Sequence, residues 1–204
     1  MKRNVLFAIA LLIAMNVAAQ TTKEVYAGYS RVMDYINSGN KSNTGYGDGL
    51  EVGINFIRPI SKPFALTYGI QGMYAWSNGT DPSTHLYEKS KFVKFLVPVS
   101  FLCEIRPSSG KFAVEPFAGV NTSFYALGKT KEGGKTYDWF DGKDSFDLSR
   151  IQFGWHVGAN LIYDRYMLTV NYQQDFTDVR GSNGKYYGGS LHWANMELRL
   201  GYRF

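Results

Sequence analysis

Apolar and polar residues alternate with a period of two along the carboxyl-terminal stretch, residues 194–204. One face of this stretch is apolar throughout, and the other carries an amide at Asn195 and three charges at Glu197, Arg199 and Arg203. Such alternation is typical of a β-strand, whose successive side chains point to opposite faces. A row with three charges is too polar for the interior of a soluble β-sandwich. The pattern therefore predicts a strand with lipid on its apolar side.

The same alternation recurs along the chain in about eight segments, which cover residues 24–33, 50–56, 66–76, 93–104, 114–125, 151–163, 168–175 and 194–204. Long polar connections at 34–47, 77–91, 127–148 and 177–187 alternate with short turns at 58–63, 106–111 and 164–165. A membrane barrel with both termini on the periplasmic side has this order of loops and turns. We therefore predict an all-β fold, an eight-stranded antiparallel up-and-down transmembrane β-barrel.

Pro98 interrupts the fourth segment. Proline has no backbone N–H and removes one donor from a strand ladder. We expect a bulge or locally loosened pairing at this residue.

The amino terminus has the parts of a secretory signal: Lys2 and Arg3, an apolar run at 5–15, and small residues up to Ala19. We expect a signal peptide at 1–19 and a barrel domain at 20–204; the alternative is a short anchoring helix that stays in place. No other stretch approaches the roughly 20 apolar residues of a membrane helix, which excludes a helical membrane protein.

Composition adds little about partners. The formal charge of +5 includes Lys2 and Arg3, so removal of the signal leaves +3. This small excess does not favour nucleic acid or another polyanion as a partner. The single cysteine, Cys103, has no partner for an internal disulfide.

The ending of the chain, with Leu198, Leu200, Tyr202 and Phe204, resembles the signature that the barrel-insertion machinery reads in bacterial outer-membrane barrels. In build, nearly the whole chain resembles the porin-like outer-membrane barrel family common in Bacteroidetes, which is similar to the outer-membrane protein A type transmembrane domain. The resemblance implies a place in the outer membrane of a Gram-negative bacterium. It also implies outer-membrane lipids and the barrel-assembly machinery as partners, and it implies no particular activity.

The inner faces of the predicted strands carry ionisable residues of both signs: Glu51, Lys94, Glu104, Glu115, His156, Asp175, Glu197, Arg199 and Arg203. Eight strands enclose a space just wide enough for side chains to fill, and buried charges must be paired. We expect Arg199 and Arg203 to pair near the level of Glu104 and Glu115 and to close the lumen. The alternative is a proton or ion path through these groups.

Catalytic signals are weak. His156 is the one histidine on an inner face, and no His-x-Ser pair lies on one strand face, so the alternative of a lipid-modifying barrel enzyme has little support. No metal-ligand spacing or phosphate-binding glycine loop occurs, and no cofactor is implied. A further alternative is a soluble lipocalin-type barrel with an apolar inside, which the polar row of the last strand disfavours.

Aromatic residues are also frequent in the predicted outer loops, at Tyr137, Trp139, Phe140, Tyr186 and Tyr187. They form either a binding surface for an extracellular ligand or protein, or a group that folds onto the barrel rim. The leading hypothesis is a non-enzymatic outer-membrane barrel with a side-chain-filled lumen, serving envelope structure or surface interaction.

Overall fold

The computed structural model describes residues 21–38, 41–80, 87–107, 110–140, 148–179 and 190–204. The predicted signal segment 1–19 lies outside these residues. The strands within them are β1 (Thr22–Ser38), β2 (Lys41–Ser61), β3 (Phe64–Thr80), β4 (Tyr87–Cys103), β5 (Phe112–Glu132), β6 (Lys135–Asp138), β7 (Ile151–Tyr163), β8 (Tyr166–Asp175) and β9 (Ser190–Arg203). Within the described ranges, the structure has no helix that is long and apolar enough to cross a membrane.

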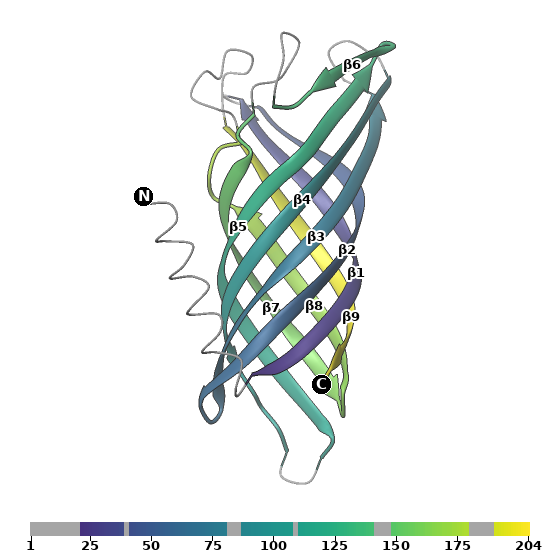
Figure 1. Ribbon diagram of the computed structural model, residues 1–204. Coiled ribbons are helices and arrows are strands. Elements are labelled where there is room, and N and C mark those ends of the chain that lie inside the picture. Colours follow the sequence, from purple (N-terminus) through teal and green to yellow (C-terminus); the bar gives the residue numbers. More distant parts are fainter. Residues whose placement is uncertain (1–20, 39–40, 81–86, 108–109, 141–147, 180–189) are drawn as a thin grey trace, which may run out of the picture.

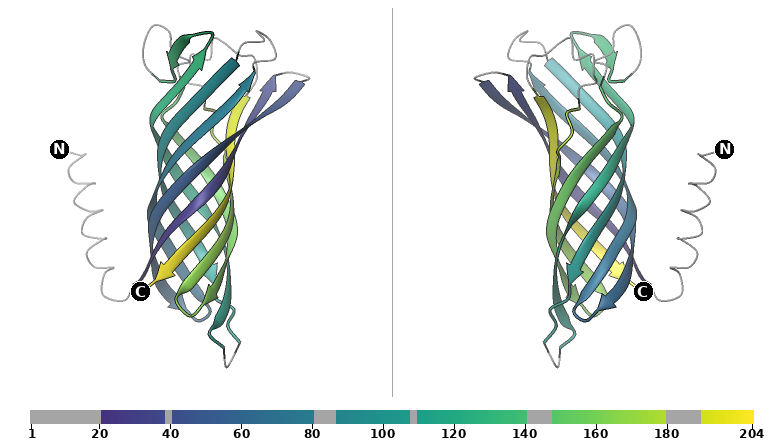
Figure 2. Two further views of the ribbon diagram at one scale, coloured as in Figure 1. Left: turned by 90° about the vertical axis from the view of Figure 1, so that its right-hand side faces the viewer. Right: turned by 90° about the vertical axis from the view of Figure 1, so that its left-hand side faces the viewer.

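Eight of these strands form one closed antiparallel barrel. The sheet runs β4-β3-β2-β1-β9-β8-β7-β5, and a further pairing of β4 with β5 closes it. The short β6 pairs with the far end of β5 alone. The tilted strands surround one lumen, and the carboxyl terminus lies at the end opposite β6 (Figures 1 and 2). The predicted eight-stranded up-and-down barrel is confirmed.

Side chains alternate along each strand between the lumen and the outer surface. In β7, Ile151 and Phe153 are exposed on the outside, while Gln152 and His156 are buried inside. The outer surface of the barrel wall is largely apolar and the middle of the lumen is polar. This is the reverse of a soluble protein and the arrangement of a barrel in lipid. It also differs from the apolar interior of a lipocalin-type barrel.

Several strands are longer than the sequence pattern indicates. The predicted loop at 34–47 is wrong, because β1 and β2 stay paired out to Ser38 and Lys41. The predicted loop at 127–148 is also partly wrong, because β5 continues to Glu132 and β6 folds back on it. Ser, Asn and Gly favour turns locally, but pairing with a neighbouring strand overrides that preference.

Pro98 has the predicted effect on one side only. The β3–β4 ladder has no pairs between Tyr68–Val99 and Gln71–Leu96, the gap in which Pro98 lies. The bulge itself lies between Val93 and Lys94, toward the end of β4 that carries β6, where the β4–β5 ladder skips Ala126.

Candidate functional site in the lumen

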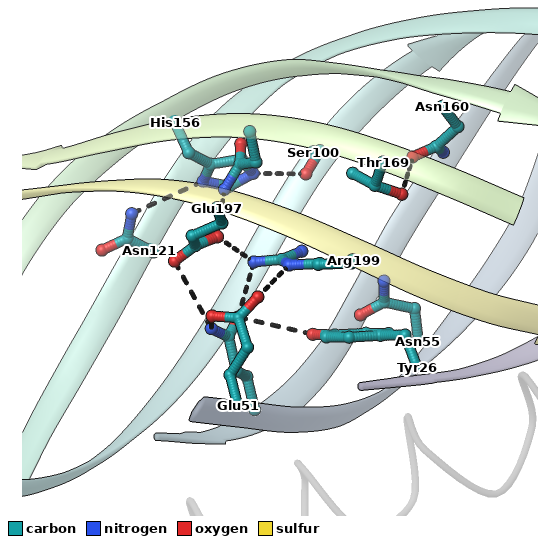
Figure 3. Close-up of polar contacts among 12 residues, drawn as sticks. Tyr26, Glu51, Asn55, Ser100, Asn121, His156, Asn160, Thr169, Glu197 and Arg199 are labelled. Carbon is teal, nitrogen blue, oxygen red and sulfur yellow. Dashed lines mark hydrogen bonds and ion pairs between the residues drawn. The ribbon is translucent and has the colours of Figure 1, made fainter. Parts of the chain in front are cut away.

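A buried ionic network crosses the middle of the lumen (Figure 3). Arg199 on β9 donates from Nε to Glu51 Oε1 on β2 at 2.6 Å, and it also forms an ion pair with Glu197. Gln71 on β3 accepts from Arg199 Nη2 at 2.9 Å and donates to Glu51 Oε2 at 2.6 Å. Asn171 on β8 donates to Glu197 Oε2 at 2.7 Å. The guanidinium group thus links β9 to β2 and β3, and Glu197 extends the network to β8.

A glycine makes room for this network. Gly28 on β1 is the ladder partner of both Glu51 and Arg199. A Cβ atom at this position would lie 2.7 Å from the carbonyl oxygen of Leu198 and 2.9 Å from Cγ of Arg199. Because Gly28 has no side chain, the arginine can pass over β1 to reach Glu51. The guanidinium carbon also lies 4.7 Å from the ring centroid of Tyr26 on the same strand.

A second ionic group joins the two ends of the barrel sequence. Arg203 forms two hydrogen bonds with Glu115, each 2.7 Å long, and a third with Glu24 at 3.1 Å. Glu24 also accepts from Asn55 at 2.9 Å. The pairing of Arg203 with Glu115 matches the sequence prediction, whereas Arg199, expected at the same level, pairs with Glu51 and Glu197. The sequence prediction did not include Glu24. Its place two residues before Tyr26, on the same face, is the signal that marks it as inward.

Lys94 is buried farther along the lumen. Its Nζ lies 5.9 Å from the ring centroid of Tyr125. With the amide of Asn195 turned so that its oxygen faces Lys94, that oxygen accepts from Nζ at 2.6 Å. Asp175 accepts from the Tyr125 hydroxyl at 3.4 Å. The lysine and this carboxylate therefore contribute to a polar layer that continues the ionic network.

Next to the network, Ser100 and His156 lie within hydrogen-bonding distance, with 2.6 Å between Ser100 Oγ and His156 Nε2. On the other side of the ring, Asn121 lies 3.5 Å from Nδ1. In the part of the chain that the structure describes, no carboxylate hydrogen-bonds to His156. A lumen cavity of about 30 Å³ adjoins this pair. Such a volume holds water but no lipid or sugar.

Aromatic side chains close the lumen at the end that carries β6. Trp193 stacks on Phe92 with 5.7 Å between ring centroids and an interplanar angle of 4°, and it lies 4.5 Å from Tyr125. Trp139 lies 5.4 Å from Phe92 and 5.2 Å from Trp193. Its Nε1 donates to Thr130 Oγ1 at 2.9 Å, which satisfies its polar atom. We call this cluster the aromatic cap; its buried members are Val32, Met73, Ala75, Phe92, Tyr125, Trp139, Phe140, Val179 and Trp193.

The aromatic cap corrects the predicted surface patch. Trp139 and Phe140 are each only 7% exposed, so they are core residues of the barrel mouth and no part of an exposed surface. The chain after β6 turns inward, and burial of two large rings stabilises this course. Tyr137 is half-buried. The remaining two members, Tyr186 and Tyr187, lie outside the described residues.

Glu104 is a second correction. It lies at the rim of the barrel, just past the end of β4 at Cys103, where the backbone still hydrogen-bonds to Pro63 and, at Ile105, to Val114. Its side chain is 39% exposed and pairs with neither Arg199 nor Arg203. Glu104 instead accepts from Arg106 Nε at 2.6 Å in a solvent-exposed ion pair. The predicted pairing of Glu104 with the lumen arginines is therefore wrong.

The residues of the terminal signature lie along the outside of β9. Leu198 and Leu200 are 50% and 69% exposed, and Phe204 is also exposed. Tyr202 is half-buried and accepts from Arg165 Nη1 at 3.3 Å in the neighbouring turn. Within the described residues, no group of three or more His, Cys, Asp or Glu side chains could hold a metal ion.

Comparison with known proteins gives the fold alone. No family model matches the chain, and no curated protein matches it. Among solved structures, Ail, the attachment invasion locus protein of Yersinia pestis, is 14% identical with a TM-score of 0.45, and the match covers 91% of this chain and 99% of that one. Neisserial surface protein A (NspA) is 12% identical with a TM-score of 0.49, over 89% of this chain and 97% of that one. The outer membrane enzyme PagL is 12% identical with a TM-score of 0.42, over 85% and 98%. The assignment to a family common in Bacteroidetes therefore stays a prediction.

Proposed function

We propose that this chain is a small, non-enzymatic barrel of the bacterial outer membrane, with a closed lumen and a role in envelope structure or surface interaction. The apolar outer face of the barrel wall supports the membrane location, because exposed groups such as Leu50, Val52, Phe101 and Leu200 would be costly in water. The termini and the short turns then lie on the periplasmic side, and β6 lies outside the cell.

The proposal of a closed lumen is supported by two layers of packed side chains that block it. The Arg199 network fills the middle, and the aromatic cap fills the end nearer β6. A hydrated ion would have to break a buried ion pair and also pass a layer of packed rings. Buried pairs that lose one partner cost about 3–5 kcal/mol, so such openings are rare.

The partners in this proposal are lipid and the assembly machinery. The exposed apolar belt contacts the acyl chains of the bilayer, and the terminal strand with Leu198, Leu200, Tyr202 and Phe204 is the segment that the barrel-assembly machinery reads. An extracellular ligand or protein would meet the barrel at the end that carries β6.

Planar-bilayer recording of the purified full-length protein tests the closed lumen. Insertion is checked in the same preparation by the shift in gel mobility between boiled and unboiled samples. We expect inserted protein to give no steady conductance. Large and steady conductance from inserted protein would contradict the proposal and favour a narrow ion or small-solute channel.

One observation favours a second candidate, a lipid-modifying enzyme: the Ser100–His156 pair, in which a histidine nitrogen lies at 2.6 Å from a serine hydroxyl. Both side chains are buried, however, and the adjoining cavity of about 30 Å³ admits no lipid. Mass spectrometry of lipid A and phospholipids from cells that express wild type, Ser100→Ala or His156→Ala tests this candidate. Identical profiles support the non-enzymatic role, and a product that only the wild type makes would contradict it.

A further inference from the structure

Four lysines gather on the outer face of the barrel at the end that carries β6. Lys91 on β4 is the ladder partner of Lys129 on β5, and one step farther out Lys89 is the partner of Lys131. All four side chains are exposed. Like charges directly opposite each other in a sheet destabilise the pairing, and an anion that contacts both members of a rung offsets this cost.

The position of these rungs relative to the apolar belt is well defined. The next outward-facing rung toward the middle of the barrel pairs Val93 with Leu127, and the one after that pairs Phe95 with Phe124. Leu127 is 59% exposed and Phe124 is 45% exposed, as expected for lipid-facing residues. The lysines therefore begin where the apolar belt ends, at the level of lipid headgroups.

Aromatic residues on β3 complete the site. Trp76 is the ladder partner of Lys91, and Tyr74 is the partner of Val93 one outward rung lower. The two rings lie 5.7 Å apart. Trp and Tyr are enriched at the boundary between membrane and water, where one side of the ring meets hydrocarbon and the other meets polar groups. The two rings thus mark the same boundary as the lysines.

These residues line a groove with a volume of about 310 Å³. Sites for small molecules begin at about this size. Asp138 on β6 is the ladder partner of Lys129 and offsets part of the charge. The described residues that line the groove include the four lysines and no carboxylate. Such a groove suits a ligand with more than one anionic group.

We propose that this groove binds the phosphate groups of an anionic glycolipid anchored in the outer leaflet of the membrane, with its sugar against Trp76 and its acyl chains along Leu127 and Val93. The inference rests on the outer-membrane location proposed above. A soluble sulfated polysaccharide would share the charge but gain nothing from the adjoining apolar belt. The contiguity of lysine, aromatic and apolar rungs therefore favours a lipid.

The test measures binding of diphosphoryl lipid A to the purified full-length protein in detergent, by native mass spectrometry. The test variant is Lys91→Gln/Lys129→Gln. Lys91→Arg/Lys129→Arg keeps the charge, and Arg58→Gln/Lys62→Gln removes two exposed charges from the opposite end of the barrel. Gel mobility of unboiled samples reports folding for each variant.

We expect the wild type to retain one lipid A molecule and the glutamine variant to bind it at least about tenfold more weakly, since each lost charge-assisted contact is of that order. The arginine variant and the Arg58/Lys62 control should bind as the wild type does. Dephosphorylated lipid A should bind weakly to all of them.

Equal binding of diphosphoryl lipid A by the wild type and the glutamine variant would overturn the proposal, as would equal binding of the dephosphorylated lipid. Lysine-dependent binding of heparin without binding of lipid A would also overturn it and indicate a soluble polyanion. None of these results touches the fold or the closed lumen, because mobility and conductance are measured separately.

Discussion

Arg199 reaches Glu51 across an intervening strand, with 2.6 Å between Nε and Oε1 although the two residues are 148 positions apart in sequence. β1 lies between their strands, and Gly28 is the point at which the arginine passes over it. The pair therefore links β2 directly to β9. It forms only when the barrel closes around β1.

Replacing Arg199 tests how much this ion pair contributes to the free energy of unfolding. Arg199→Gln leaves the carboxylates of Glu51 and Glu197 buried without their cation, and we expect a loss of about 3–5 kcal/mol in the free energy of unfolding. The matched control is Arg31→Gln, which breaks the exposed ion pair with Asp48 and should cost below about 1 kcal/mol. Urea unfolding of protein folded into lipid vesicles, followed by tryptophan fluorescence, measures both. Similar losses for the two variants would contradict a stabilising role of the network.

Gly28→Ala tests the passage over β1. The added methyl group meets the Leu198 carbonyl oxygen at 2.7 Å, and because backbone cannot move aside easily, we expect a loss of about 1–3 kcal/mol. Gly72→Ala is the matched control, since the nearest atom to its Cβ is a ring carbon of Phe95 at 3.7 Å. That substitution should be neutral or slightly stabilising. If both alanine variants unfold at the wild-type urea concentration, the close approach at Gly28 has no energetic weight.

Trp193→Ala tests the aromatic cap. Removing a ring that contacts Phe92, Tyr125 and Trp139 leaves a cavity inside the lumen, and we expect a loss of about 3–5 kcal/mol. Phe101→Ala on the outer surface, where the ring is 65% exposed, should cost below about 1 kcal/mol because lipid tails are as apolar as the lost ring. The same vesicle unfolding assay compares the two variants. The Phe101 variant keeps both tryptophans that contact Phe92, Trp139 and Trp193. A larger loss at Phe101 than at Trp193 would show that the cap is poorly packed.

Much of the barrel follows from period-two alternation alone. The apolar and polar faces of β7 and β9 could be assigned residue by residue, because a slip by one position would place Glu197 and Arg199 in lipid at a cost of about 2–4 kcal/mol for the arginine. The same rule identified Glu51, Lys94 and Glu115 as inward. It did not predict that Glu104, just past the end of β4, lies at the solvent-exposed rim and pairs with Arg106.

The partners inside the lumen could not be predicted in the same way. Which carboxylate Arg199 reaches depends on the tilt and stagger of strands far apart in the sequence, and these follow from closure of the barrel. The inward turn of Trp139 was hidden for a related reason. Its burial depends on Phe92 and Trp193 from other strands, while its own neighbours in sequence read as a polar loop.

Photolabelling from the bilayer interior tests the central claim most directly. The full-length protein is folded into vesicles that contain a phospholipid with a diazirine in its acyl chain, and labelled residues are mapped by mass spectrometry. Our account predicts label on Leu198 and Leu200 and none on Glu197 and Arg199, which are 2% and 7% exposed. Label on Glu197 and Arg199 in place of the two leucines would contradict it.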